Sequence, residues 1–208
     1  EKDFTVGSIL AEEWAITYGA KWTFSVAMAM VFLVAIVSQL VMALLVYLLR
    51  LDGTALGNIL GGLLPILVNV PVSVGLFMIA IKRASSLPIK WTQIFDYFQY
   101  TFRLVGTSLL STFITVVGYI FLILPGIYLS LCYAYALPLI IDRDLEVWEA
   151  MEVSRKTVTK HWFRLFFLWL LTIIILFFSS IPLGIPLIWT GPMAMLVYGV
   201  SYCRLFGA

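Results

Sequence analysis

Long uncharged runs separated by short charged segments dominate the chain. The four longest runs are 22–49, 53–81, 104–141 and 165–203. A membrane-spanning helix needs about 20 apolar residues, and the last two runs are nearly twice that length. As single helices they would extend roughly 55 Å, against a hydrocarbon core of about 30 Å. Each of these two runs must therefore fold back once, and the pattern predicts six transmembrane helices.

Proline and glycine mark the points where the two longest runs fold back. Leu124-Pro125-Gly126 interrupts the third run, and the segment 181–186, with a proline at each of positions 182 and 186, interrupts the fourth. Proline lacks an N–H donor and glycine tolerates turn torsions, so both sites favour a tight turn. A longer loop is expected at 50–62. The predicted helices are 22–49, 60–82, 103–123, 126–142, 162–181 and 185–205.

Three prolines recur at a nearly constant interval. Pro65, Pro125 and Pro186 are separated by about 60 residues, a period typical of duplicated units. Because each unit holds two helices, all units enter the membrane in the same direction. We expect an all-α integral membrane protein, a single domain over 1–208, built from three parallel helical hairpins. The repeat units are approximately 5–83, 88–142 and 144–206.

An amphipathic segment precedes each predicted hairpin. In the second and third, apolar residues recur at helical spacing opposite a charged face, and Asp144 is placed to cap the third. Such helices lie in the membrane interface or pack under the helix bundle, with tryptophan at headgroup depth. The apolar stripes are Val6, Leu10, Trp14 and Tyr18, then Trp91, Ile94, Phe95, Phe98, Phe102 and Val105, then Val147, Ala150, Met151, Ser154, Val158 and Trp162.

Composition and charge support this topology. Residues are 62% hydrophobic and 12% charged, which is too little polar surface for a water-soluble globule. The six-helix path places twelve of the thirteen Lys and Arg residues on one side and leaves only Arg50 on the other. Basic residues favour the cytoplasmic side, so both termini are expected there.

Candidate catalytic groups are sparse. The sequence carries no serine-hydrolase elbow, zinc-protease motif, P-loop or dinucleotide-binding motif. His161 is the only histidine, and a solvated turn with a helix N-cap explains the acidic cluster around Asp142, Asp144 and Glu146 better than a cation site does. We expect no enzymatic activity, no cofactor, no metal site and no nucleic-acid partner.

Two sets of residues remain as candidates for function. Asn69, Tyr133 and Thr190 lie near prolines in the second, fourth and sixth helices, where transporter sites are often built, although close helix packing is the stronger explanation of the small and polar residues there. The second set combines basic and aromatic residues that could hold anionic lipid headgroups, each basic group contributing about 1 kcal/mol. Its members are Trp148, Lys156, Lys160, His161, Trp162 and Arg164.

These sets support two hypotheses. In the first, the chain interacts with anionic lipid or serves as a membrane scaffold or accessory subunit, with membrane lipids and a membrane protein or a second copy as partners. In the second, it is a small transporter or channel for an apolar or weakly polar substrate.

The stretches 125–129 and 137–142, followed by 148–155 and His161-Trp162, carry a family resemblance. They resemble a broad group of bacterial six-helix inner-membrane proteins of unknown function. This group includes the YciC-like proteins and the membrane domain that precedes some glycerophosphodiester phosphodiesterases. The resemblance is strongest over 120–165. It implies a six-helix fold in the bacterial inner membrane, and without the phosphodiesterase domain it carries over no catalytic residue.

Overall fold

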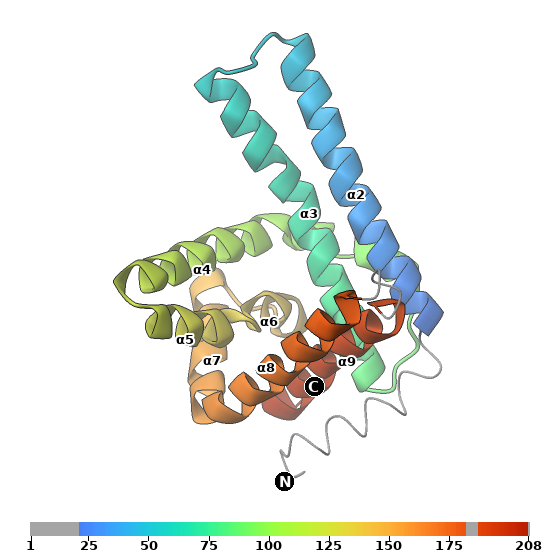
Figure 1. Ribbon diagram of the computed structural model, residues 1–208, viewed down its shortest axis with the longest axis vertical. Coiled ribbons are helices and arrows are strands. Elements are labelled where there is room, and N and C mark those ends of the chain that lie inside the picture. Colours follow the sequence, from blue (N-terminus) through green and yellow to red (C-terminus); the bar gives the residue numbers. More distant parts are fainter. Residues whose placement is uncertain (1–20, 182–186, 208) are drawn as a thin grey trace.

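The structure, a computed structural model, describes residues 21–181 and 187–207 (Figure 1). These residues form helices and connecting turns without a strand, so the all-α prediction is confirmed for them. The amphipathic segment predicted around Val6–Tyr18 and the turn at 182–186 lie outside the described residues. The helices are α2 (Lys21–Leu48), α3 (Ala55–Ala84), α4 (Thr101–Phe121), α5 (Ile123–Tyr133), α6 (Ala136–Arg143), α7 (Val147–Lys160), α8 (Trp162–Ser180) and α9 (Leu187–Phe206).

Five helical stretches in the described residues are long and apolar enough to cross a membrane. The last predicted span, 185–205, overlaps α9, which is not one of the five. Polar residues along α9, including Tyr198, Ser201 and Arg204, lower its hydropathy. The five stretches are Trp22–Leu48, Ala55–Ala84, Trp91–Phe121, Ile123–Arg143 and Trp162–Ser180.

The helices pair as antiparallel hairpins that leave a shared packed region in different directions. Figure 1 shows α2 and α3 projecting together, with α4 and α5 extending at a wide angle to them. Side chains near the tips of these hairpins are exposed, among them Leu48 and Ile59 in the first and Phe121 and Leu124 in the second. The tips of these two hairpins therefore carry exposed apolar surface.

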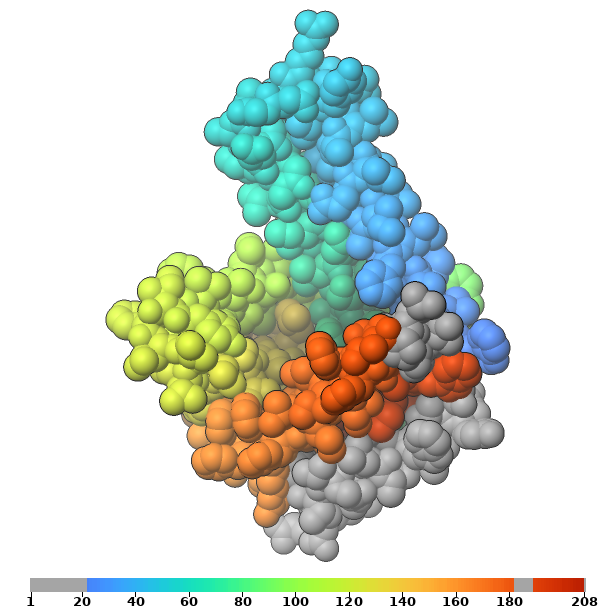
Figure 2. All heavy atoms as spheres, in the orientation of Figure 1, coloured from blue at the N-terminus to red at the C-terminus, as the bar shows by residue number. Residues whose placement is uncertain are grey.

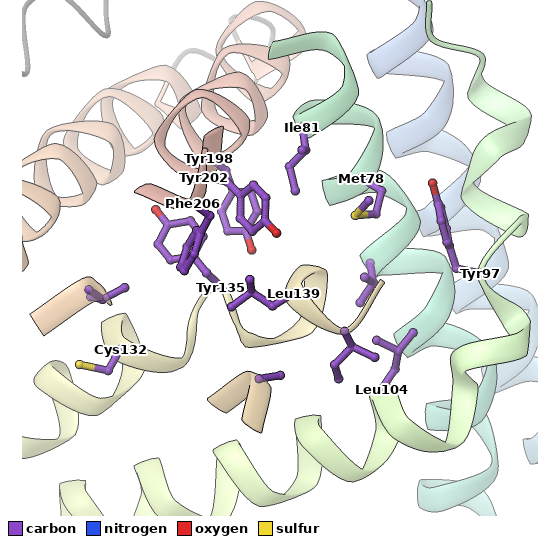
Figure 3. Close-up of a cluster of buried hydrophobic side chains, with 14 of the residues drawn as sticks. Met78, Ile81, Tyr97, Leu104, Cys132, Tyr135, Leu139, Tyr198, Tyr202 and Phe206 are labelled. Carbon is purple, nitrogen blue, oxygen red and sulfur yellow. The ribbon is translucent and has the colours of Figure 1, made fainter. Parts of the chain in front are cut away.

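The C-terminal ends of α3, α6 and α9 meet, and α7 packs against the same region. The Tyr202 hydroxyl donates to Asp142 Oδ2 at 2.7 Å, and Arg143 donates to the Phe206 carbonyl. Tyr135 stacks on Tyr198 with ring centroids 4.9 Å apart (Figure 3). We call the region where the C-terminal ends of α3, α6 and α9 meet “the base”.

The predicted fourth helix, 126–142, is interrupted between α5 and α6. Pro138 has no N–H to donate to the Ala134 carbonyl, which instead accepts a hydrogen bond of 2.8 Å from the Tyr198 hydroxyl of α9. The Cys132 carbonyl, also freed by the interruption, accepts from Ser154 Oγ of α7 at 2.6 Å. Buried carbonyls need such partners, so side chains from α7 and α9 stabilise the kink.

The predicted amphipathic helix over 90–105 is wrong. Its first part forms two short 3-10 turns, η1 (Trp91–Phe95) and η2 (Phe98–Tyr100), before α4 begins. Ile94 is buried, whereas Phe102 of the predicted apolar stripe is 85% exposed. A Cβ at Gly75 of α3 would lie 2.6 Å from Ile94 Cα, which shows that the η1 backbone packs directly on α3. This close contact, rather than the helical period, determines the local conformation.

Two predicted boundaries also need correction. The helix expected to begin at residue 60 begins at Ala55, because the Thr54 hydroxyl accepts from the Gly57 N–H at 3.0 Å and caps it. Most of the expected loop 50–62 is therefore helix. Asp144, expected to cap the helix that follows, instead ends α6 in a left-handed conformation with φ of 49°, and Glu146 precedes α7.

Candidate lipid-headgroup interface

One face of α7 anchors it to the base. Ala150, Met151, Ser154 and Val158 are all buried, at the spacing of one helical stripe. These four belong to the predicted stripe of this segment, which is confirmed at these positions. Helix α7 contacts α4, α5, α6, α8 and α9, so it joins the second hairpin to the third.

The opposite face of α7 carries positive charge. Arg155, Lys156 and Lys160 are exposed, and Arg164 follows on the first turn of α8. Among the described residues, no carboxylate lies within 4.0 Å of the charged nitrogens of Arg155, Lys160 or Arg164. The exposed face therefore presents cations that are available to an external anion.

Lys156 is the exception on this face. Its Nζ lies 2.8 Å from Glu152 Oε1, one helical turn earlier. The hydrogen bond from Lys156, together with its charge, lowers the pKa of Glu152. Glu152 is thus charged at neutral pH and offsets Lys156, and the exposed Glu149 adds a further negative charge in the first turn of α7. Arg155, Lys160 and Arg164 are the cations of this face that have no carboxylate of a described residue within 4.0 Å.

A small hollow of about 80 Å³ opens beside Arg155. Tyr133 at the end of α5 lines it, as do Trp148, Met151 and Glu152 from α7. Trp148 is 65% exposed, so an indole and a guanidinium two helical turns apart share an open surface. A guanidinium is suited to bind a phosphate, and an indole is suited to the membrane interface.

The junction of α7 and α8 adds aromatic surface. Trp162 stacks on Phe166 with ring centroids 5.2 Å apart, and its ring centroid lies 6.1 Å from that of Tyr128 of α5. His161 lies between the helices, where its backbone N–H donates to the Val158 carbonyl at 3.0 Å. Trp162 therefore packs against α5, whereas Phe163 beside it is exposed.

The acidic cluster before α7 has structural partners. Arg103 of α4 lies 2.7 Å from Asp144 Oδ1 and 3.3 Å from Glu146 Oε1. Asp142 accepts a hydrogen bond from Tyr202. Asp144 and Glu146 tie α4 to the loop between α6 and α7, and Asp142 ties α9 to the end of α6. Among the described residues no group of three or more His, Cys, Asp or Glu side chains could hold a metal ion.

The structure does not bring Asn69, Tyr133 and Thr190 together. Asn69 lines a hollow with residues of α2, α4 and α6, whereas Tyr133 lines the hollow beside Arg155. Thr190 lines a third, very small hollow between α8 and α9. Each of the three residues therefore lines a different hollow, and a transport path between the second helices of the hairpins stays a prediction.

Comparison of the chain with models of known protein families, with curated proteins and with solved structures gives no match.

Sequence reasoning missed two features of this surface. Arg155 was not in the predicted headgroup set, although its spacing of seven residues from Trp148 places both on one helical face. The second feature is the position of Tyr133 close to Trp148. It depends on how α5 packs against α7, which no local sequence pattern predicts.

Proposed function

We propose that the chain is a non-enzymatic inner-membrane protein that binds anionic lipid headgroups along α7, and through them organises lipid or supports a partner subunit. The observation that carries this proposal is the charged face of α7. Arg155 and Lys160, with Arg164 beyond them, lie without carboxylate partners next to the exposed Trp148, on a helix whose other face is buried in the base.

The positions of the basic residues support a six-span topology with both termini in the cytoplasm. Basic side chains occur at the ends of helices that meet at or near the base, which would then face the cytoplasm. In the proposed topology α9 is the sixth span, and its polar groups are tolerated because neighbouring helices bury them. These basic residues are Lys82 and Arg83 in α3, Arg103 in α4, Arg143 in α6, Arg164 in α8 and Arg204 in α9.

The meeting of α3, α6 and α9 supports the threefold hairpin repeat. Each is the second helix of its hairpin or the end of one, and each contributes its C-terminal end to the base. Equivalent ends of repeats are expected to meet, whereas the wide angle between the α2–α3 and α4–α5 hairpins departs from a parallel arrangement (Figure 1).

The test is lipid binding by the full chain after replacement of the cations. The test uses a triple variant that combines Arg155→Ala, Lys160→Ala and Arg164→Ala. Its free energy of binding to phosphatidylglycerol in nanodiscs should weaken by about 3 kcal/mol, at about 1 kcal/mol for each charge removed. Native mass spectrometry of retained lipid or a fluorescent-lipid titration measures this change.

Arg50→Ala is the matched control, because Arg50 lies in the turn between α2 and α3, at the far end of that hairpin. It should leave the affinity unchanged. Equal binding by the triple variant and the parent protein would refute headgroup recognition by α7.

A further inference from the structure

The hollow that Asn69 lines lies in the notch between the α2–α3 and α4–α5 hairpins (Figure 2). Its volume is about 240 Å³, several times the roughly 30 Å³ share of one water molecule. Four polar side chains from three helices line it: Gln39 from α2, Asn69 and Ser73 from α3, and Ser108 from α4. The remaining lining is apolar and includes Phe77 and Leu137.

The hydrogen-bonding groups of this hollow are incompletely used. Asn69 Nδ2 donates to Ser38 Oγ at 3.2 Å, and Ser38 Oγ donates to the Ala35 carbonyl at 2.9 Å. The side chains of Gln39, Ser73 and Ser108 make no hydrogen bond to any other residue that the structure describes. An amide and two hydroxyls therefore face an open space with their donors and acceptors available.

The surroundings make this arrangement unusual. Asn69 lies midway along α3, and both α2 and α3 are long and apolar enough to cross a membrane. Polar groups in hydrocarbon are costly unless they have partners. No charged residue lines the hollow, so an ionic ligand would lack a counter-charge there.

We propose that this hollow is a binding site for a neutral, membrane-dissolved amphiphile whose polar group is a hydroxyl or carbonyl. Gln39, Ser73 and Ser108 hydrogen-bond that group, and the apolar lining contacts the adjoining hydrocarbon. The site is separate from the charged face of α7 and is selective against anionic lipid.

Photolabelling of the full chain in nanodiscs tests this site. The probe is a diacylglycerol carrying a diazirine close to its glycerol hydroxyl, and mass spectrometry locates the label. The label should concentrate on the parts of α2, α3 and α4 that line the hollow. Unlabelled diacylglycerol should compete with it, whereas phosphatidylglycerol should not.

Two kinds of variant sharpen the result. Gln39→Leu removes an amide, and labelling should fall about fivefold, the factor expected for one hydrogen bond of typical net strength. Ser108→Leu fills the space and should reduce labelling at least as much. Ser73→Ala is the conservative variant, with an expected reduction of about threefold and little risk to folding.

Asn58→Leu is the matched control, because Asn58 is an exposed polar residue of α3 outside the hollow. It should label as the parent does, and so should the triple variant of α7, which keeps this site distinguishable from the headgroup surface. Even labelling along the apolar surface of α2, or undiminished labelling in Ser73→Ala and Gln39→Leu, would overturn the proposal.

Discussion

At the scale of single residues, Gly199 determines how closely α3 and α9 approach. A Cβ at this position would lie 2.6 Å from the carbonyl carbon of Ala80 and 3.0 Å from the Ile81 nitrogen. Both are backbone atoms, which cannot rotate away as a side chain can. The absent side chain therefore permits the contact between two helices that form the base.

Gly199→Ala should destabilise the protein by about 2 kcal/mol, because the overpacking cost of about 1–3 kcal/mol applies to a rigid backbone contact. Reversible unfolding in mixed detergent and sodium dodecyl sulfate measures the change. Gly61→Ala is the control: a Cβ at Gly61 has no neighbour within 4 Å. That variant should be neutral or more stable by up to about 1 kcal/mol, since alanine favours helix. Equal stability of the two variants would contradict this role of Gly199.

Pro138 shows how far single residues can be interpreted from sequence. Its lack of an N–H predicts a kink in the fourth helix, and the helix is interrupted there. The partners of the freed carbonyls were not predictable, because Tyr198 is 64 residues from Ala134 and Ser154 is 22 residues from Cys132. Only tertiary packing brings these hydroxyls to the kink.

At the scale of elements, two similar patterns had different outcomes. The stripe of 144–162 forms α7 with its predicted face buried, whereas the stripe of 90–105 is divided between 3-10 turns and the start of α4. The difference arises at Gly75, where the η1 backbone packs against α3 more closely than a regular helix with side chains would permit. Periodicity predicts an apolar face, and tertiary contact determines the conformation that presents it.

The docking of α7 should depend on its buried stripe. Ala150→Glu places an unpaired carboxylate at a fully buried position, so it should destabilise the base by several kcal/mol or detach α7. Glu149→Ala, at the neighbouring exposed position, should change stability by less than about 0.5 kcal/mol. Thermal unfolding and limited proteolysis within α7 measure both effects. If Ala150→Glu were as stable and as protease-resistant as Glu149→Ala, α7 would not be anchored through this face.

At the scale of the whole molecule, run length and charge position predict the hairpins but not their mutual directions. The segment 22–49 is helical as Lys21–Leu48, and 162–181 as Trp162–Ser180, because long apolar runs favour helix of matching length. The wide angle between the first two hairpins was not predictable. An apolar residue facing lipid and one facing a neighbouring helix have the same character in sequence.

The notch between the first two hairpins was not predictable either, because it arises from the angle between them. Gln39 and Asn69 were visible as polar residues in apolar runs, whereas Ser108 gains significance only because α4 crosses beside α3. The candidate headgroup surface was more accessible to prediction, since most of it lies on one short helix.

We propose that the base and α7 face the cytoplasm of a bacterial cell. The side of the membrane on which each segment lies is measured most directly by cysteine labelling with a membrane-impermeant maleimide, in a background with Cys132→Ala and Cys203→Ala. Asp52→Cys, in the turn between α2 and α3, should be labelled in intact spheroplasts. Lys156→Cys, on the exposed face of α7, should be labelled only after permeabilisation. Labelling of Lys156→Cys in intact spheroplasts would contradict the topology and with it the proposed cytoplasmic headgroup surface.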